Sequence, residues 1–325
     1  MKTILTSLLV GSLLTTLAVA QQPSRFAVRR GFAYNPERRM DQTSLRGADS
    51  RLAYVITIAF QFGVVDLRSG AFLPIGPDLP ADVGDGLVQG RDRSLLSLGF
   101  DGNLYAIDPF TGQTSVVGAT GLGDCSTPTS PCGPDSANWI GRFHGHYYIT
   151  DFANNLYSLD PKTAATKLIG PTGIPGITFV PFSPNPDGSV NVFAEGLFGF
   201  RGKFYAYFST QAVNFATGTF TNLIPGEIYE IDPATGHATP VAPADSSFSA
   251  IATVHDTVYA FDAILGQVDI VDPTTGNATL VTDLDPAAGV IAGAAPAVPA
   301  SPAIHWWALR PHKKREPKLM RGGSG

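Results

Sequence analysis

The stretch Asn103-Leu104-Tyr105-Ala106-Ile107-Asp108-Pro109-Phe110-Thr111-Gly112 decides the fold, because it recurs along the chain. Further copies begin at Asn155, Glu227 and Gln267, and a fainter one begins at Phe62. In each copy, apolar and polar residues alternate up to an Asp-Pro-x-Thr-Gly turn or its remnant, and a second short apolar run follows. Proline has no N–H for a sheet ladder and glycine accepts a positive φ. Each copy therefore predicts a strand, a tight turn and a hairpin partner.

The repeat extends upstream of these copies. Two further β-like runs precede each one, most clearly at residues 249–254 and 257–261, and four strands make one blade of a β-propeller. The turn aspartates from Asp66 to Asp272 follow one another at intervals of 42, 52, 72 and 40 residues. A unit without insertions thus takes about 40 residues, which is typical of propeller repeats. Because the aspartate recurs in every unit, we assign it to the turn amides and not to catalysis.

The two ends of the repeat region predict how the propeller closes. Residues 289–294 have the pattern of one more innermost strand, whereas the first unit, from Leu52, begins at its second strand. Joining them would close five blades without an exposed sheet edge. Residues 24–50 could supply a sixth, degenerate blade, so six blades is the alternative. We predict an all-β propeller over residues 52–295, an N-terminal extension over 21–51 and a flexible, Pro-rich and basic tail over 296–325.

The pattern Leu-Tyr-x-Ile-Asp-Pro-x-Thr-Gly-x-x-Thr-x-Val-Gly resembles the repeats of bacterial secreted β-propeller proteins. These are distantly similar in form to the regucalcin and gluconolactonase group. The resemblance covers residues 52–295 and implies the propeller fold. It lies in the blades and not in a site, and propellers host unrelated activities, so it implies no reaction.

The first twenty residues predict export. Lys2 precedes an apolar run from Ile4 to Leu17, and residues 18–20 offer small side chains for cleavage before Gln21. This is the pattern of a secretory signal peptide. A membrane anchor is the competing interpretation, but the run is short for a span and contains Thr and Ser. We expect a secreted or periplasmic protein with no stable membrane span after cleavage.

The chain has two cysteines, Cys125 and Cys132, in a segment whose Pro and Gly content predicts a loop. In an exported protein such a pair is expected to form a local disulfide. A zinc site would need two further ligands and a reactive thiol would need a nearby base, so both interpretations rank below the disulfide.

The formal charge of −5 is unevenly distributed. Residues 310–325 carry +5, whereas residues 21–309 carry −11. An acidic body argues against nucleic acid as a partner. The basic tail could touch an anionic surface, although a solvated chain end is the commoner case.

Three insertions fall on one side of the predicted propeller. Segments 125–132 and 171–192 each connect two blades, and segment 209–225 connects the second and third strands of the fourth blade. Because strands alternate in direction within a blade, all three lie on one face, which we call the insertion-rich face. The Asp-Pro turns lie on the opposite face. Elaboration of one rim predicts a binding surface, and chance placement of three loops is the alternative.

Several of the innermost strands begin with polar residues on that face. Asp85, Asn138 and Glu195 would converge at the channel mouth as oxygen ligands suited to Ca²⁺. The gluconolactonase-like group holds a metal there on Glu, Asn and Asp ligands, so the resemblance implies the same role for these residues. The alternative is that they are ordinary turn residues. The loops after the second strands add further carboxylates: Asp101, Asp151 and Asp262.

Aromatic residues in or near the insertions could supply contact area for a ligand. They are Trp139, Phe179, Phe182 and Phe215. Their alternative role is to pack the loops themselves. The sequence His144-Gly145-His146 lies between the first and second strands of its blade, on the opposite face, where we expect a solvated turn.

No sequence motif names a reaction. The chain lacks Gly-x-Ser-x-Gly, His-Glu-x-x-His and a phosphate-binding loop. The leading hypothesis is a non-catalytic exported propeller that binds a small molecule, a glycan or a protein through its insertion-rich face. The alternative is a metal-dependent hydrolase of small esters or lactones, with Glu195, Asn138 and Asp85 as ligands and a water activated by the ion.

Overall fold

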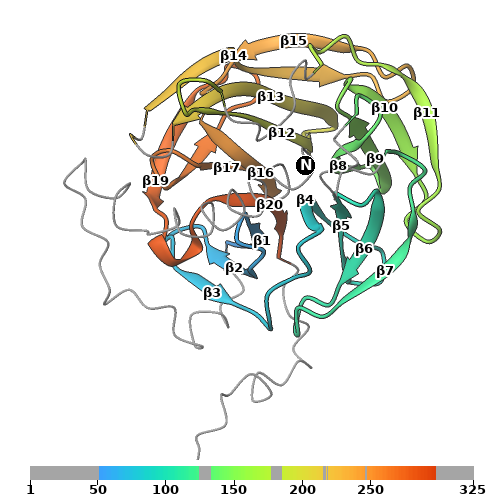
Figure 1. The fold of residues 1–325 in the computed structure, drawn as a ribbon, viewed down its shortest axis with the longest axis horizontal. Helices are drawn as coiled ribbons and strands as arrows, with labels where there is room; N and C mark the ends of the chain where they lie inside the picture. The colour runs from blue at the N-terminus through green and yellow to red at the C-terminus, as the bar shows by residue number, and fades with distance from the viewer. Residues whose placement is uncertain are drawn as a thin grey trace, which may run out of the picture.

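The computed structural model describes residues 51–123, 133–176, 185–214, 217, 219–245 and 247–297. They form five four-stranded antiparallel sheets, arranged as blades around a common axis (Figure 1). The five-bladed propeller expected from the repeat is confirmed.

Each blade is given from its innermost to its outermost strand. The first blade consists of β20 (Ile291–Pro296), β1 (Leu52–Thr57), β2 (Phe62–Asp66) and β3 (Phe72–Pro74). The second consists of β4 (Val83–Gln89), β5 (Leu95–Gly99), β6 (Asn103–Ile107) and β7 (Thr114–Ala119). The third consists of β8 (Ala137–Phe143), β9 (His146–Asp151), β10 (Asn155–Leu159) and β11 (Thr166–Pro171). The fourth consists of β12 (Val190–Phe200), β13 (Lys203–Asn214), β14 (Thr219–Ile231) and β15 (Ala238–Pro243). The fifth consists of β16 (Phe248–Val254), β17 (Thr257–Asp262), β18 (Gln267–Val271) and β19 (Ala278–Asp283).

The recurring aspartates hold the outer turns, as the repeat predicts. Asp108 Oδ1 accepts hydrogen bonds from the backbone N–H groups of Phe110 at 2.8 Å and Thr111 at 3.0 Å. Gly112 closes this turn with φ of 69°. A Cβ atom there would lie 2.6 Å from the carbonyl oxygen of Ile75 in the preceding blade. Glycine is therefore required both by the backbone conformation and by the close packing of adjacent blades.

The C-terminal strand closes the propeller, as expected. β20 pairs with β1 in antiparallel register, with Ala53 opposite Pro296 and Val55 opposite Ala294. A short 3₁₀ helix, η3 (Pro286–Ala288), precedes β20, and Asp285 caps it by accepting from Ala287 N at 2.9 Å. The first blade is thus assembled from both ends of the repeat region.

The hydrophobic core consists of five clusters, one between each pair of neighbouring blades. Successive side chains of a strand point to opposite faces of its sheet. Tyr54 accordingly packs against the second blade and Val55 against the fifth. This explains why inner strands such as β1 and β5 are buried on both faces.

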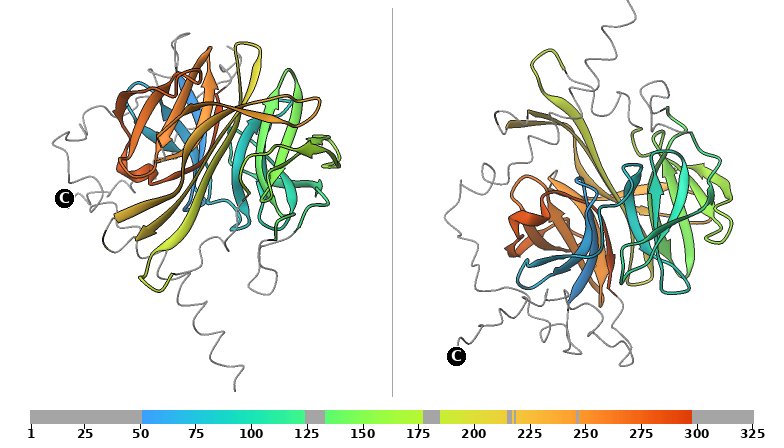
Figure 2. Two further views of the ribbon diagram at one scale, coloured as in Figure 1. Left: turned by 90° about the horizontal axis from the view of Figure 1, so that it is seen from above. Right: turned by 60° about the horizontal axis from the view of Figure 1, so that its bottom comes forward.

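The fourth blade departs from the others. Its strands β12, β13 and β14 have 11, 12 and 13 residues, and Figure 2 shows them reaching beyond the strands of the other blades. Residues 190–194, 209–214 and 219–226 form this part, which we call the fourth-blade extension. Val213 pairs with Val190 on one side and with Phe220 on the other.

The extension corrects the expectation that segments 171–192 and 209–225 are simple connections. Residues 190–192 belong to β12, and most of the second segment continues β13 and β14. The physical reason is that these residues are rich in Thr, Val and Phe, which favour strands. By continuing the ladder they satisfy their own backbone hydrogen bonds.

Candidate functional site

Glu195 and Asn138 meet between the third and fourth blades. Asn138 Nδ2 donates a hydrogen bond to Glu195 Oε2, and Thr150 Oγ1 donates to Glu195 Oε1 at 2.9 Å. Glu195 and Thr150 are each 1% exposed, and Asn138 is 0% exposed. The structure therefore brings together two of the three residues expected at the channel mouth, inside the interface and away from solvent.

The environment of Glu195 favours its neutral form. Burial raises the pKa of the carboxyl to about 8, the hydrogen bond from Thr150 opposes this shift, and the negative charge of Asp151 adds to it. No cation in the described part of the chain forms a salt bridge with Glu195. A buried acid without a cation remains protonated at neutral pH.

Asn138 carries an unused acceptor. Its Oδ1 atom is buried and has no hydrogen-bond partner in the described structure. A buried polar atom without a partner destabilises the fold by about 1–3 kcal/mol. If the amide were rotated, a neutral Glu195 could donate its carboxyl proton to Oδ1. The same oxygen is also available to a ligand or an ion.

A β-bulge sets the direction of Asn138. The pairing of β8 with β9 shifts between Ala137 and Trp139, so that Asn138 lies in a bulge. Bulges re-aim side chains and are enriched near functional sites. As a result, Asn138 and its neighbour Trp139 both face the fourth blade.

Trp139 is a core residue in this structure. It is buried and packs in the cluster between the third and fourth blades, which also contains Tyr148 and Phe204. It was expected to offer contact area on the insertion-rich face, but the bulge turns its side chain into the blade interface. Phe179, Phe182, Phe215, Cys125 and Cys132 lie outside the described residues. The backbone of Asp85 lies in β4 and pairs with Leu98 of β5.

The additional carboxylates on this face act within turns. Asp101 accepts hydrogen bonds from Asn103 N at 3.1 Å, Asn103 Nδ2 at 2.6 Å and Tyr105 OH at 2.7 Å. Asp151 accepts from Asn155 N at 2.8 Å, Asn155 Nδ2 at 2.8 Å and Tyr157 OH at 2.9 Å. The recurring Asn-Leu-Tyr at the start of the third strand is the signal that could have predicted this role.

Asp262 occupies the corresponding turn of the fifth blade. Its Oδ1 accepts from the backbone N–H groups of Ile264 at 2.8 Å and Leu265 at 2.7 Å. Its Oδ2 accepts from Ser247 Oγ at 2.6 Å. Burial raises the pKa of Asp262.

The donor set for a cation is incomplete among the described residues. Glu195 and Asn138 supply the oxygen types that Ca²⁺ prefers, and the unpartnered Oδ1 atom is a suitable ligand. However, no group of three or more His, Cys, Asp or Glu side chains that could hold a metal occurs in the described ranges. The metal site at Asp85, Asn138 and Glu195 stays a prediction.

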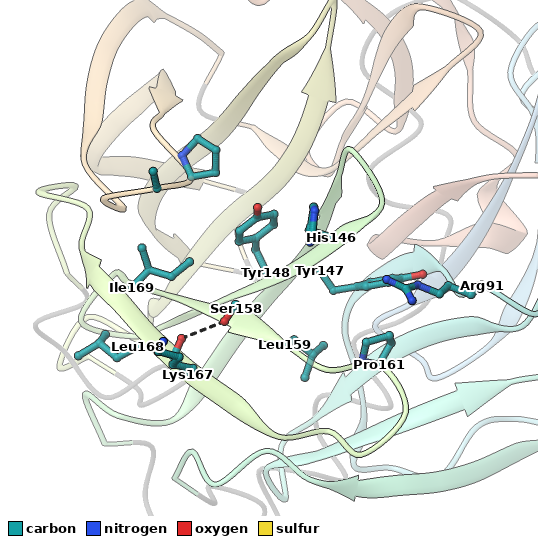
Figure 3. Close-up of a pocket in the computed structure, with 12 residues that line it drawn as sticks. Arg91, His146, Tyr147, Tyr148, Ser158, Leu159, Pro161, Lys167, Leu168 and Ile169 are labelled. Atoms are coloured by element: carbon teal, nitrogen blue, oxygen red, sulfur yellow. Dashed lines mark hydrogen bonds between the residues drawn. The ribbon is translucent and has the colours of Figure 1, made fainter.

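A pocket of 410 Å³ lies on the opposite face (Figure 3). It is formed mainly by β9, β10 and β11 of the third blade, with Arg91, Pro161, Pro233 and Ala234 from neighbouring turns. His146 lines it, so the turn that contains this histidine borders a depression. Ser158 Oγ donates to the carbonyl oxygen of Lys167 at 3.4 Å within it. Sequence reasoning placed function on the other face and did not predict this pocket.

No helix among the described residues is long and apolar enough to cross a membrane.

Comparison with known proteins finds distant structural similarity only. No family model matches the chain, and no curated protein matches it. Solved structures show distant similarity to β-propeller proteins.

Three of these structures illustrate the similarity. A protein of unknown function from Bacteroides thetaiotaomicron has a TM-score of 0.39 and 13% identity, over 72% of this chain and 58% of that one. A virginiamycin B lyase from Staphylococcus aureus has a TM-score of 0.33 and 11% identity, over 69% of this chain and 63% of that one. An aldose sugar dehydrogenase from Streptomyces coelicolor has a TM-score of 0.39 and 14% identity, over 78% of this chain and 91% of that one. The chain thus spans less than two thirds of the first two.

Proposed function

We propose that this propeller binds a small molecule, a glycan or a protein through its insertion-rich face, with the fourth-blade extension as the main contact. The observation that supports this proposal is the length of β12, β13 and β14, which is unique among the five blades. Extra structure on one rim of a repeat protein is typical of a binding surface.

The outer edge of β14 is suited to contact. β15 pairs with β14 only from Glu227 to Ile231, so residues 219–224 have no strand partner on that side in the described structure. Leu223 on this edge is 47% exposed, and Thr219, Thr221 and Asn222 are exposed as well. Unpaired strand edges can add a strand from a partner. Residues 219–224 contain no Lys or Pro, and Pro225 marks where this part of the edge ends.

The test compares two exposed leucines. Leu223→Lys places a charge on the edge, and Leu168→Lys is the matched control on the outer strand β11, where Leu168 is 54% exposed. Ligands would be identified with the unmodified protein on a glycan array, a peptide library and a small-molecule thermal-shift panel. We expect Leu223→Lys to weaken binding at least about tenfold, and Leu168→Lys to leave it unchanged.

A second variant tests the extension as a whole. Replacing residues 212–221 with Asn-Gly joins Gln211 to Asn222, which are paired across the hairpin, through a favoured two-residue turn. Binding should be lost while the propeller remains folded by circular dichroism. Undiminished binding by this variant, or equal losses in the two leucine variants, would overturn the proposal.

Hydrolysis with a bound cation is the second candidate, because Asn138 Oδ1 is unpartnered beside the carboxyl of Glu195. A divalent ion held there would supply an activated water for attack on an ester or lactone. For this, Glu195 would have to release its proton, and Asn138 would have to present its oxygen. Calcium should then raise the melting temperature, and Glu195→Gln should abolish the rise. An unchanged melting temperature would exclude this candidate.

A further inference from the structure

Positive charge is confined to one end of the propeller. Between residues 51 and 297 the chain has nine Lys and Arg residues. All of them lie in, or within two residues of, the turns on the opposite face, or at the start of β1 at the same end. They are Arg51, Arg68, Arg91, Arg93, Arg142, Lys162, Lys167, Arg201 and Lys203. The connections on the insertion-rich face contain aspartates but no Lys or Arg, so this face is anionic.

The fifth blade departs from the repeat at one position of its third strand. In the second, third and fourth blades this position is a tyrosine whose hydroxyl donates to a nearby carboxylate. The pairs are Tyr105 with Asp101, Tyr157 with Asp151 and Tyr229 with Glu227, at 2.7, 2.9 and 2.8 Å. In the fifth blade the residue is Asp269, which is opposite Ala260 just as Tyr229 is opposite Ala206. The side chain of Asp269 thus lies on the same side of its sheet as the side chains of Tyr105, Tyr157 and Tyr229 in their own sheets.

Asp269 is buried without a hydrogen-bond partner. Its exposed fraction is 7%, and no donor in the described residues reaches its carboxylate. Burial raises its pKa to about 6, and the negative charges of Asp262 and Asp245 add to the shift. Where the second, third and fourth blades place a phenol donor beside a carboxylate, the fifth blade places a second acid.

The neighbouring hydroxyl does not resolve the shortage of donors. Ser247 Oγ lies 2.6 Å from Asp262 Oδ2 and 2.8 Å from Asp245 Oδ1. A hydroxyl has one proton to donate, so it can bond only one of these carboxylates at a time. Asp245 Oδ1 also accepts from Ser247 N at 3.0 Å, and no bond from Ser247 reaches Asp269 in the described structure. Asp245 is exposed and Asp262 is buried, so the group reaches from the surface into the blade.

We infer that Asp245, Asp262 and Asp269 form a binding site for an alkyl-ammonium or alkyl-guanidinium group. These acids are not part of any metal-binding group in the described structure. An organic cation differs from a metal ion because its N–H groups point in several directions and can reach separate acceptors. Asp245 marks the entrance, and Asp269 receives the donor that the tyrosine supplies elsewhere. The inference rests on the proposed binding role of the insertion-rich face and adds the chemistry of the ligand.

The experiment is calorimetric titration of the full chain with 1,5-diaminopentane and with agmatine, at a pH above the pKa of Asp269. Asp269→Asn removes the charge, and Asp269→Tyr introduces the residue of the second, third and fourth blades. Asp256→Asn is the control, since Asp256 is an exposed acid in the β16–β17 turn of the same blade, on the opposite face. We expect both Asp269 variants to weaken binding at least about tenfold, and the control to bind like the unmodified protein.

Two further ligands serve as controls. The neutral 1,5-pentanediol should not bind. The affinity of an end-blocked tripeptide with a central lysine, compared with that of the diamine, shows whether a peptide or a free amine is the preferred partner. Equal affinity in the unmodified protein and both Asp269 variants, or equal binding of the diol, would overturn the inference. The variant with the shortened extension should still bind the diamine, because the site lies in the fifth blade. Failure of the proposed function and failure of this inference are therefore distinguishable.

Discussion

The fourth and fifth blades share one template, yet each buries an acid in a different setting. In the fourth blade, Glu195 accepts hydrogen bonds from the neutral groups of Thr150 and Asn138. In the fifth, Asp269 has neighbouring carboxylates, and no described residue donates to its carboxylate. The first arrangement can persist as a neutral acid, whereas the second attracts a positive charge. Specialised positions of a repeat protein can therefore be found where one blade departs from a pattern that several other blades share.

The largest expected effect comes from opening the propeller next to the fifth blade. Deleting residues 291–297 removes β20, which pairs with β1 and contributes Ile291 and Ala294 to the core shared with the fifth blade. We expect loss of the cooperative unfolding transition, because an edge and a core cluster become exposed. Calorimetry would measure this. Removal of residues 298–325 is the control and should leave the transition intact, and equal damage from both truncations would contradict the closure.

The next effect concerns the neutral acid of the fourth blade. The pKa of Glu195 rises from 4.5 to about 8 on folding. Below pH 4.5 both states are protonated and no penalty arises. Between these values the unfolded state loses its proton first, so stability falls as pH rises. Glu195→Gln should remove this loss and stabilise the fold by about 2–3 kcal/mol near pH 7.

The measurement for this variant is a series of denaturant titrations from acid to alkaline pH. Gln keeps both contacts if the Asn138 amide rotates, because its Nε2 then donates to Asn138 Oδ1 while its oxygen accepts from Thr150. A stability difference that does not grow with pH would show that Glu195 is ionised in the folded protein.

A smaller effect is expected for the acid of the fifth blade. Its pKa rises from 3.8 to about 6, so its destabilising effect appears between these values and is complete above the higher one. Asp269→Asn should therefore stabilise the protein by about 1 kcal/mol above pH 6, and by much less near pH 4. The difference should also shrink when diamine is present, because the ligand stabilises only the unmodified site. Chemical denaturation at the two pH values tests this, and a destabilised variant would argue that Asp269 has a donor.

The smallest effect tests the tyrosine that the fifth blade lacks. Tyr157→Phe removes the hydroxyl that donates to the buried carboxylate of Asp151. We expect a loss of about 1 kcal/mol. Tyr148→Phe is the matched control, since the hydroxyl of Tyr148 makes no hydrogen bond in the described structure. Similar stability changes in the two variants would show that the recurring tyrosines contribute through packing alone.

The repeat predicted the architecture because its signals are local. An Asp-Pro-x-Thr-Gly turn depends on neighbouring residues, and five such turns or their remnants, spaced by about 40 residues or more, define the blades. The fourth-blade extension could not be predicted in this way. Residues such as Thr219 and Asn222 are polar, and only pairing with β13 makes them part of a strand.

The candidate site was predicted in part for a similar reason. The inner-strand positions of Glu195 and Asn138 suggested one site, and the structure joins the two by a hydrogen bond. Burial of Trp139 depends on a bulge that leaves no mark in the local sequence. The sequence could have predicted that Asp101 accepts hydrogen bonds within its turn, because Asn103 and Tyr105 follow it and both side chains donate to it.

The pairing of β1 with β20 also affects how the protein is made. A ribosome produces β1 early and β20 last, so the inner edge of β1 waits for its partner until more than two hundred further residues have been synthesised. Contacts between segments so distant in sequence form slowly, and an unpaired edge invites association with other chains meanwhile. The propeller ring therefore cannot close during early elongation, and an interrupted chain would leave the first blade open along its inner side.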